Sequence, residues 1–269
     1  MNKVKMIFSI LFLLLLVLCS GCGSGGISDK EGKEDIAACF EQADTTELHA
    51  RQEQNDLSIE LNHVVFEENL VILDYTLKSA DLSQYEDVLS GFRKEDLENG
   101  DGYTVAVKEE AKEKRIIAYL EVTGGVFSHE NVGEDVEIIF SSLYGEEGSG
   151  IEMTFPVKIE EVFMPTVVEA GQEFSCADGA VLLKSIVISK FHTDVHMDIT
   201  DCPTFMEKFY GWEITDESGK VLQWISGSGE TYNYSALPES CKELKLSLIK
   251  YKEDNSYEKI GDTVTIPMR

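Results

Sequence analysis

The chain has 269 residues, of which 43% are hydrophobic, so it can bury two ordinary cores and is not a disordered tail. Its 50 Asp and Glu residues outnumber 23 Lys and Arg residues, which gives a net charge of −27. A polyanion of this size repels phosphate backbones and anionic lipid headgroups, and nucleic acid is therefore excluded as a partner.

Residues 1–21 have the organisation of a secretory signal peptide. Two lysines lie in Met1–Lys5, the apolar run "MIFSILFLLLLVLC" occupies Met6–Cys19, and the small residues Ser20 and Gly21 follow. The apolar run is shorter than the ~20 residues that a membrane-spanning helix needs. We therefore predict that residues 1–21 are removed, with an uncleaved anchor helix as the alternative.

The sequence Cys19-Ser20-Gly21-Cys22, preceded by Leu18, resembles a bacterial lipobox. In that pattern the last cysteine receives a diacylglyceride on its sulfur and becomes the new N-terminus. Cys19 stands where the pattern usually has Leu, which is a modest departure. The resemblance implies lipidation of Cys22 and anchoring on the outer face of the cell membrane, where each buried CH₂ adds ~0.8 kcal/mol. Residues 22–55 are then predicted to be a tether or stalk that contains at most a short helix.

Four cysteines lie beyond the anchor, namely Cys39, Cys176, Cys202 and Cys241. The outer face of a membrane permits disulfides. We predict a bridge between Cys202 and Cys241, with Cys176–Cys202 as its rival and buried thiols as a third outcome, because connectivity cannot be deduced from spacing. Their spacing does not match a zinc site.

Residues 56–165 show the period-two alternation of half-buried antiparallel strands. The clearest example is "IEMTFPVKI" at 151–159, and further examples are 57–65, 69–77 and 115–122. On the first of these, alternation places Leu57, Ile59, Leu61, His63 and Val65 on one side. Gly-containing breaks at 98–102, 123–125 and 144–150 predict turns, and Leu82–Phe92 is predicted to form one or two helical turns.

A second strand-rich region follows the predicted junction Met164-Pro165-Thr166, where a proline would interrupt a strand ladder. Its strand-like segments include "GAVLLKSIVISKF", "VHMDI", "FYGWEIT", "GKVLQWI", "ELKLSLIKY" and "TVTIPM", separated by turn signals at 216–220 and 226–230. Repeated short strands with regular turns predict an all-β chain of two sandwiches, at 56–165 and 166–269. The halves share no close sequence repeat, so any similarity between them would be one of fold.

The segment "LSIELNHVVFEENLVILDYTLKS" resembles the uncharacterised Ig-like ectodomains of Gram-positive bacteria, which are often attached to anti-sigma-factor-like membrane proteins. The segments "VLLKSIVISKFHTDVHMDI" and "FYGWEITDESGKVL" are similar to the second Ig-like domain that commonly follows. The resemblance covers most of 57–266 and implies tandem Ig-like β-sandwiches outside the cell, with no catalytic residues to transfer. Those relatives often have a spanning helix, whereas this chain has a predicted lipid anchor, and direct signal transmission across the membrane is thereby put in doubt.

The stretch "FHTDVHMDITD" is the most site-like part of the sequence. On a strand, its polar residues share one face: His192, Asp194, His196 and Asp198. A metal could bridge two of them with help from another strand, but such alternation more commonly marks a solvated polar face, and we predict no metal site. His63 is predicted to be a buried or edge histidine and not a ligand.

Motifs of the major enzyme classes do not occur. The sequence has no G-x-S-x-G, no H-E-x-x-H and no P-loop, and 96–102 does not fit an EF-hand. Acidic pairs are expected by chance among so many carboxylates. The aromatic residues Trp212, Trp224, Tyr232 and Tyr234 could form an exposed platform for a glycan or peptide, but core packing of Trp212 beside a mobile loop is preferred.

These observations predict a cell-envelope lipoprotein that is not an enzyme and needs no cofactor. Its expected role is extracellular binding or spacing, with an envelope protein or a glycan as the partner beside the membrane itself. The alternative is a sensory or regulatory ectodomain that modulates an envelope-stress system of the anti-sigma type through a protein partner.

Overall fold

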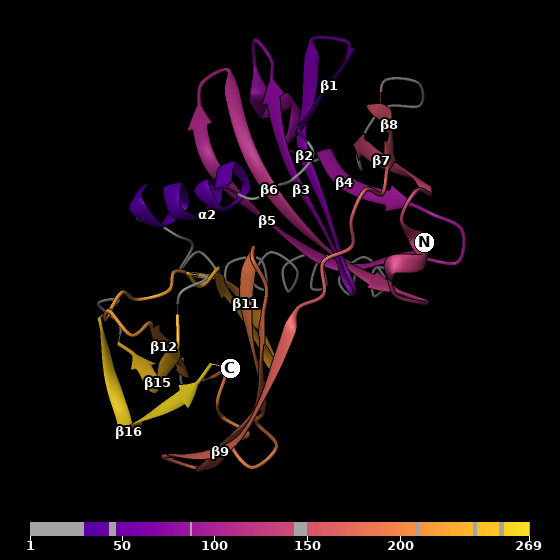
Figure 1. The fold of residues 1–269 in the computed structure, drawn as a ribbon. Helices are drawn as coiled ribbons and strands as arrows, with labels where there is room; N and C mark the ends of the chain where they lie inside the picture. The colour runs from indigo at the N-terminus through magenta and orange to yellow at the C-terminus, as the bar shows by residue number, and fades with distance from the viewer. Residues whose placement is uncertain are drawn as a thin grey trace, which may run out of the picture.

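The computed structural model describes residues 30–42, 47–86, 88–142, 150–207, 210–238, 241–252 and 256–268. The predicted signal peptide at 1–21 and the predicted lipidation site Cys22 lie outside these residues. Across the described ranges, none of the helices has the length and apolar character needed to cross a membrane. These described residues fold into antiparallel β-sheets with one α-helix, α2 (Lys30–Gln42), as Figure 1 shows.

The first set of strands forms a five-stranded sheet opposite a three-stranded one. The larger sheet has the order β1-β2-β3-β6-β5, with β1 at Glu47–Gln54, β2 at Leu57–Glu67, β3 at Leu70–Lys78, β6 at Glu113–Thr123 and β5 at Glu98–Glu110. The smaller sheet has the order β4-β7-β8, with β4 at Val88–Arg93, β7 at Asp135–Ser142 and β8 at Glu152–Lys158. Short 3₁₀ turns occupy Leu82–Tyr85 and His129–Asn131. A continuous apolar core fills the space between the sheets.

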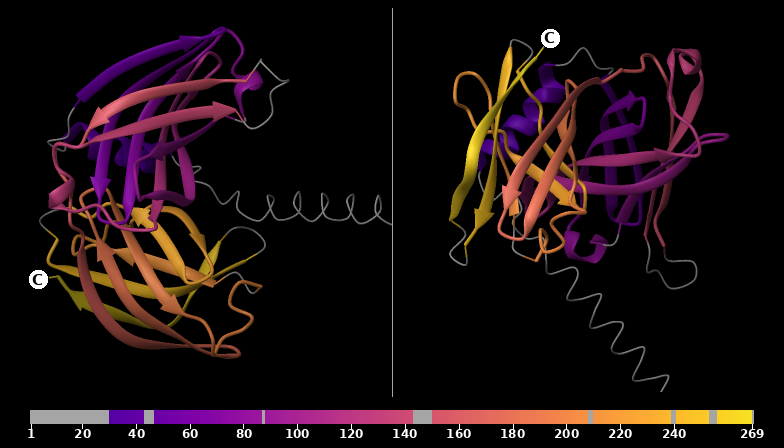
Figure 2. Two further views of the ribbon diagram at one scale, coloured as in Figure 1. Left: turned by 90° about the vertical axis from the view of Figure 1, so that its right-hand side faces the viewer. Right: turned by 90° about the horizontal axis from the view of Figure 1, so that it is seen from below.

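The second set repeats this arrangement. Its larger sheet has the order β9-β10-β11-β14-β13, with β9 at Thr166–Cys176, β10 at Gly179–Ile188, β11 at His192–Asp198, β14 at Thr231–Ser235 and β13 at Trp224–Ser228. Its smaller sheet has the order β12-β15-β16, with β12 at Tyr210–Thr215, β15 at Glu243–Tyr251 and β16 at Tyr257–Pro267. Figure 2 shows the two sandwiches stacked one on the other.

The two sandwiches have the same topology, because adding eight to each strand number of the first gives the strand order of the second. In the first, β2-β3-β6-β5 opposite β4-β7-β8 is the ABED and CFG arrangement of a constant-type immunoglobulin domain, with β1 as an additional edge strand. The predicted fold of two tandem Ig-like β-sandwiches is confirmed, and the similarity between the halves is one of fold.

The prediction that residues 22–55 are only a tether or stalk is wrong at its C-terminal end. Glu47–Gln54 forms β1, which pairs antiparallel with β2, so the first sheet begins before residue 56. The segment "ELHARQEQ" lacks a strong apolar alternation because it is an edge strand. Gln52 donates to the carbonyl of Thr154, and Gln54 donates to that of Gly150, so these side chains close the edge between β1 and β8.

Two predicted turns are also strands. Residues 98–102 form the start of β5, where the register shifts between Asn99 and Gly102. A Cβ at Gly102 would lie 2.7 Å from the carbonyl oxygen of Tyr119, so glycine is required by close backbone approach and not by a turn. The turn predicted at 226–230 is strand up to Ser228, where β13 ends, and the chain turns at 229–230 in the β13–β14 hairpin, in which Gly229 has a positive φ of 57°.

The disulfide joins Cys176 to Cys202, and the predicted Cys202–Cys241 bridge is wrong. Cys176 ends β9 and pairs with Gly179, and a Cβ at Gly179 would lie 1.8 Å from the carbonyl oxygen of Asp201. This close approach brings the loop that carries Cys202 to the end of β9. Cys241 keeps its thiol, which donates to the carbonyl of Glu243 at 3.1 Å.

Candidate functional site

The two sandwiches and α2 meet at a shared apolar cluster, which we call the joint. The first sandwich contributes the outer face of its five-stranded sheet, the second contributes two residues, and α2 contributes two more. Its buried members are Ile36, Phe40, Val65, Ile72, Val105, Ile117, Tyr119, Phe191 and Ile225. Because residues from all three parts are buried together, the joint is a third core beside the two sandwich interiors.

A bulge in β2 directs side chains into the joint. The register of β2 against β3 shifts between Leu61 and His63, so that Leu61 faces the first sandwich core whereas His63 and Val65 face outward. Simple alternation had placed these three residues on one side, and that prediction is wrong because one inserted residue reverses the faces of a strand. The bulge thereby gives β2 a second buried face.

A buried ionic triad crosses the joint between the sandwiches. The Nε2 atom of His192 lies 2.8 Å from Oε2 of Glu67, and its Nδ1 atom lies 2.9 Å from Oδ1 of Asp194. The amide of Asn233 also donates to Oδ1 of Asp194, at 2.8 Å. His192 is 3% exposed and Glu67 is 1% exposed, so the ion pair lies away from water.

The two carboxylates keep His192 in its charged form. Burial acts to lower the pKa of the imidazole, but the hydrogen bonds and charges of Asp194 and Glu67 outweigh it and raise that pKa to about 10. The imidazolium donates from both nitrogens at neutral pH and has no lone pair for a metal. His192 is therefore a structural cation of the joint.

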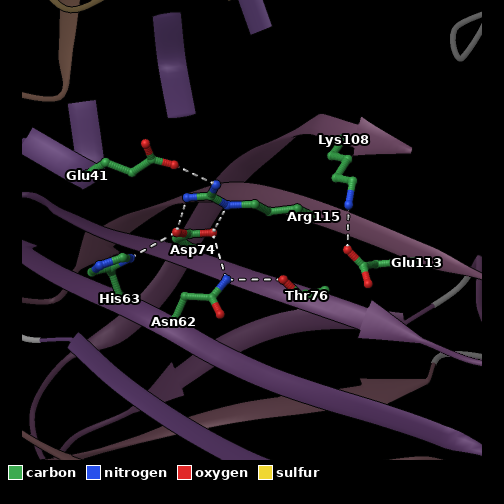
Figure 3. A network of polar contacts seen from close by, with 8 residues as sticks. All are labelled: Glu41, Asn62, His63, Asp74, Thr76, Lys108, Glu113 and Arg115. Carbon is green, nitrogen blue, oxygen red and sulfur yellow. Dashed lines mark hydrogen bonds and ion pairs between the residues drawn. The ribbon is translucent and has the colours of Figure 1, made fainter. Parts of the chain in front are cut away.

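A second ionic cluster lies under α2 and is centred on Asp74 of β3 (Figure 3). Arg115 donates from Nε to Oδ1 at 3.0 Å and from Nη2 to Oδ2 at 2.8 Å, which is a bidentate pair. His63 Nδ1 lies 2.9 Å from Oδ2, and Asn62 donates to Oδ1 at 3.1 Å. Burial opposes the ionised form of Asp74, but the hydrogen bonds from His63 and Arg115 prevail and lower its pKa.

Arg115 also connects this cluster to α2. Its Nη1 atom donates to Oε1 of Glu41 at 3.2 Å, and the ring of Phe40 lies 6.3 Å from the ring of His63. The exposed Glu41 contact contributes at most ~1 kcal/mol, whereas full burial of Ile36 and Phe40 contributes about 1.5–3 kcal/mol each. The apolar anchors therefore dominate the docking of α2.

The histidine predictions have different outcomes. His63 is buried, as predicted. Register confirms that His192, Asp194 and His196 share one face of β11, but the solvated-face interpretation is wrong for His192, because that face meets the first sandwich. Sequence reasoning could not supply Glu67 as its partner across the joint. Among the described residues, no group of three or more His, Cys, Asp or Glu side chains could hold a metal ion.

The aromatic residues of the second sandwich are mainly core residues. Trp212, Tyr232 and Tyr234 are buried, and Trp224 packs against the same cluster while partly buried. The hydroxyl of Tyr234 donates to the carbonyl of Trp212 at 2.9 Å. The predicted core packing of Trp212 is confirmed, but in place of the predicted loop Tyr232 and Tyr234 are buried residues of β14, so these rings do not form an exposed platform.

Comparisons with known proteins agree with this fold. No protein-family model matches the sequence, and no curated protein does so. Among solved structures, the conserved domain protein from Bacillus anthracis is 13% identical, with a TM-score of 0.52 over 84% of this chain and 92% of that one. The full ectodomain of mouse nectin-like molecule 4 is 11% identical over 79% of this chain and 64% of that one, and its TM-score of 0.23 carries no argument. The likeness to the Bacillus anthracis protein shows a shared fold alone.

Proposed function

We propose that this chain is a non-catalytic lipoprotein of a Gram-positive envelope, in which a lipid on Cys22 displays a stiff pair of Ig-like domains for binding or spacing outside the cell. The observation that carries the proposal is the joint. An apolar cluster and the buried pair between His192 and Glu67 hold the sandwiches against each other. A fixed relative orientation suits a spacer or a binding surface that spans both domains.

The connection between the sandwiches supports this stiffness. Ile159 and Val162 are buried in the first core, and Phe163 packs against the joint. The amide of Phe163 donates to the carbonyl of Phe66 in β2, at 2.8 Å. A connecting segment that is packed and hydrogen-bonded in this way does not act as a flexible linker.

Metabolic labelling with a clickable fatty acid tests the anchor. We expect wild-type protein and a Cys19→Ala control to take up the label, because Cys19 lies in the predicted signal peptide. A Cys22→Ala variant should lose both the label and its membrane association. Label on Cys22→Ala would contradict the proposed anchor and, with it, the envelope role.

The regulatory alternative is favoured by one observation, namely that α2, which lies within the predicted tether segment 22–55, contacts both sandwiches. Crosslinking followed by affinity capture from the native membrane separates the two roles. Reproducible recovery of one envelope protein, in the wild type and not in Cys22→Ala, would support the regulatory role. Recovery of envelope glycan alone would support the binding role and contradict the regulatory one.

A further inference from the structure

The helix α2 covers the joint from outside and bridges its two halves. Ile36 and Phe40 are four positions apart, so they project from one face of the helix, and each is only 1% exposed. The helix lies against β5 of the first sandwich and β14 of the second. Figure 1 shows it beside the level at which the two sandwiches meet.

The contacts of Phe40 join the two sandwiches through the helix. Its ring lies 5.3 Å from that of Phe191 in the second sandwich and 6.3 Å from that of His63 in the first. Glu41, one residue later, accepts a hydrogen bond from Arg115 of β6. A single turn of helix therefore holds both sides of the joint.

The helix depends on this docking for its own stability. It has 13 residues, a length at which an isolated helix is marginal in water, and it contains Gly32, which weakens a helix interior. Among the α2 residues whose side chains are described, its two large anchors are the buried members of the joint cluster, and Cys39 packs against it while partly buried. The neighbouring sheets, in contrast, have continuous hydrogen-bond ladders and their own cores. The helix should open without either sandwich unfolding.

We propose that α2 is a detachable strap, which docks reversibly in the apolar cradle formed by both sandwiches and loosens their joint when it leaves. The cradle consists of the joint residues other than those of α2, and it accepts an amphipathic helix with an aliphatic and an aromatic anchor four residues apart. The carboxylate of Glu41, which follows the aromatic anchor Phe40, pairs with Arg115. This inference goes beyond the proposed function, since it requires neither a lipid anchor nor a partner.

Release of the strap changes the surface of the protein. It would uncover the part of the joint against which Ile36 and Phe40 pack, including the ring of Phe191 in the second sandwich. A contiguous apolar face of this kind binds another apolar surface. Because α2 begins at Lys30, only eight residues after the predicted lipidation site Cys22, a pull on the N-terminal segment would act first on this contact.

Hydrogen exchange on the full chain in detergent tests the strap. We expect the amides of α2 to exchange together, at least ~100-fold faster than those of β3 and β6, because local opening requires less free energy than global unfolding. In an Ile36→Asp/Phe40→Asp variant, exchange should rise at least ~10-fold at Phe191 and His192, whose amides donate to Ser189 in the wild type. A Lys33→Asp change on the same helix is the matched control and should leave these two amides unchanged.

A peptide of residues 30–42 supplies the second measurement. Added to the Ile36→Asp/Phe40→Asp chain, it should bind saturably and restore the protection of Phe191 and His192. The same peptide with both anchors replaced by Asp should do neither. If the doubly substituted chain unfolds, protection will be lost in β3 and β6 as well. The exchange rates of α2 in the wild-type protein then test the proposal by themselves.

Three outcomes would overturn the proposal. The first is protection of α2 in the wild type that equals that of β3 and β6. The second is unchanged exchange at Phe191 and His192 when the anchors are replaced. The third is failure of the wild-type peptide to bind a variant whose sandwiches remain folded. None of these outcomes bears on lipidation of Cys22, so failure of the strap is distinguishable from failure of the proposed function.

Discussion

His192 and Glu67 lie 2.8 Å apart in the same buried ion pair, although they are 125 positions apart and belong to different sandwiches. A buried ion pair adds little net stability when compared with apolar packing, because both charges lose their hydration. Removal of one partner is costly, since it leaves the other charge buried and unpaired. The pair therefore fixes the relative orientation of the two domains.

A His192→Gln substitution should destabilise the protein by about 3–5 kcal/mol, because Glu67 then remains buried without its cation. Urea denaturation measures the change. His196→Gln is the matched control, since His196 lies on the same face of β11 but is only partly buried, and it should change stability by less than ~0.5 kcal/mol. Similar effects of the two substitutions would contradict a special role for the pair.

The same pair predicts a pH dependence in the alkaline range. The pKa of His192 is about 10 in the folded protein and close to 6.5 in the unfolded chain, so its contribution is fully present below pH 6.5. That contribution is lost as the pH rises toward 10. Glu67, Asp194 and the edge of the Tyr119 ring face the imidazole.

Urea denaturation of the wild type and of His192→Gln, from pH 6 to pH 10.5, isolates this effect. Lysines and tyrosines titrate in both proteins, so their effects cancel in the difference between the two free energies of unfolding. The wild type should lose a few kcal/mol relative to the variant over this range. A constant difference would show that His192 is not charged in the folded state.

The sequence predicts the strands whose two faces differ in polarity. The segment 151–159 alternates strictly, and β8 follows it within a residue at each end. In contrast, β1 lacks an apolar alternation, and its place in the sheet depends on backbone pairing with β2 and on the side chains of Gln52 and Gln54. Edge strands of this kind carry little periodic signal, which explains why the first sandwich was predicted to begin too late.

The joint was beyond prediction for a different reason. Its residues come from α2, from both sandwiches and from strands far apart in the chain, and no local pattern connects Glu67 to His192. One signal was present, because consecutive residues are apolar at 64–66 at the end of β2 and at 70–73 at the start of β3. Such a run indicates a strand covered on both sides, and it could have shown that this sheet supports a second core.

The disulfide gives a third prediction. Non-reducing peptide mapping should find Cys176 linked to Cys202 and Cys241 as a thiol. The bridge spans 26 positions, for which loop-closure entropy gives about 3 kcal/mol, so a Cys176→Ala variant should lose roughly this much stability. Cys241→Ala should cost less than ~1 kcal/mol, because its partly buried thiol makes a single hydrogen bond to the described part of the chain, to the carbonyl of Glu243. A peptide that links Cys202 to Cys241 would contradict this assignment.

Two of the carboxylates in Figure 3, those of Asp74 and Glu113, provide a comparison of burial within one sheet. The carboxylate of Asp74 is fully buried and is held by Arg115 and His63, whereas Glu113 pairs with Lys108 at the surface. An Asp74→Asn substitution removes the charge that compensates the Arg115 guanidinium and exchanges an acceptor oxygen for an amide donor. We expect a loss of about 3–5 kcal/mol in urea denaturation.

Glu113→Gln is the matched control for Asp74→Asn, because it makes the same change from carboxylate to amide in a pair that solvent screens. It should cost less than ~1 kcal/mol. A similar loss of stability should appear when the wild type is acidified. Because the pKa of Asp74 is lowered in the folded protein, the contribution of its charge is present above the pKa of the unfolded state and is lost as the pH falls through the pKa of the folded state. Equal losses for the two substitutions would mean that burial does not distinguish these carboxylates.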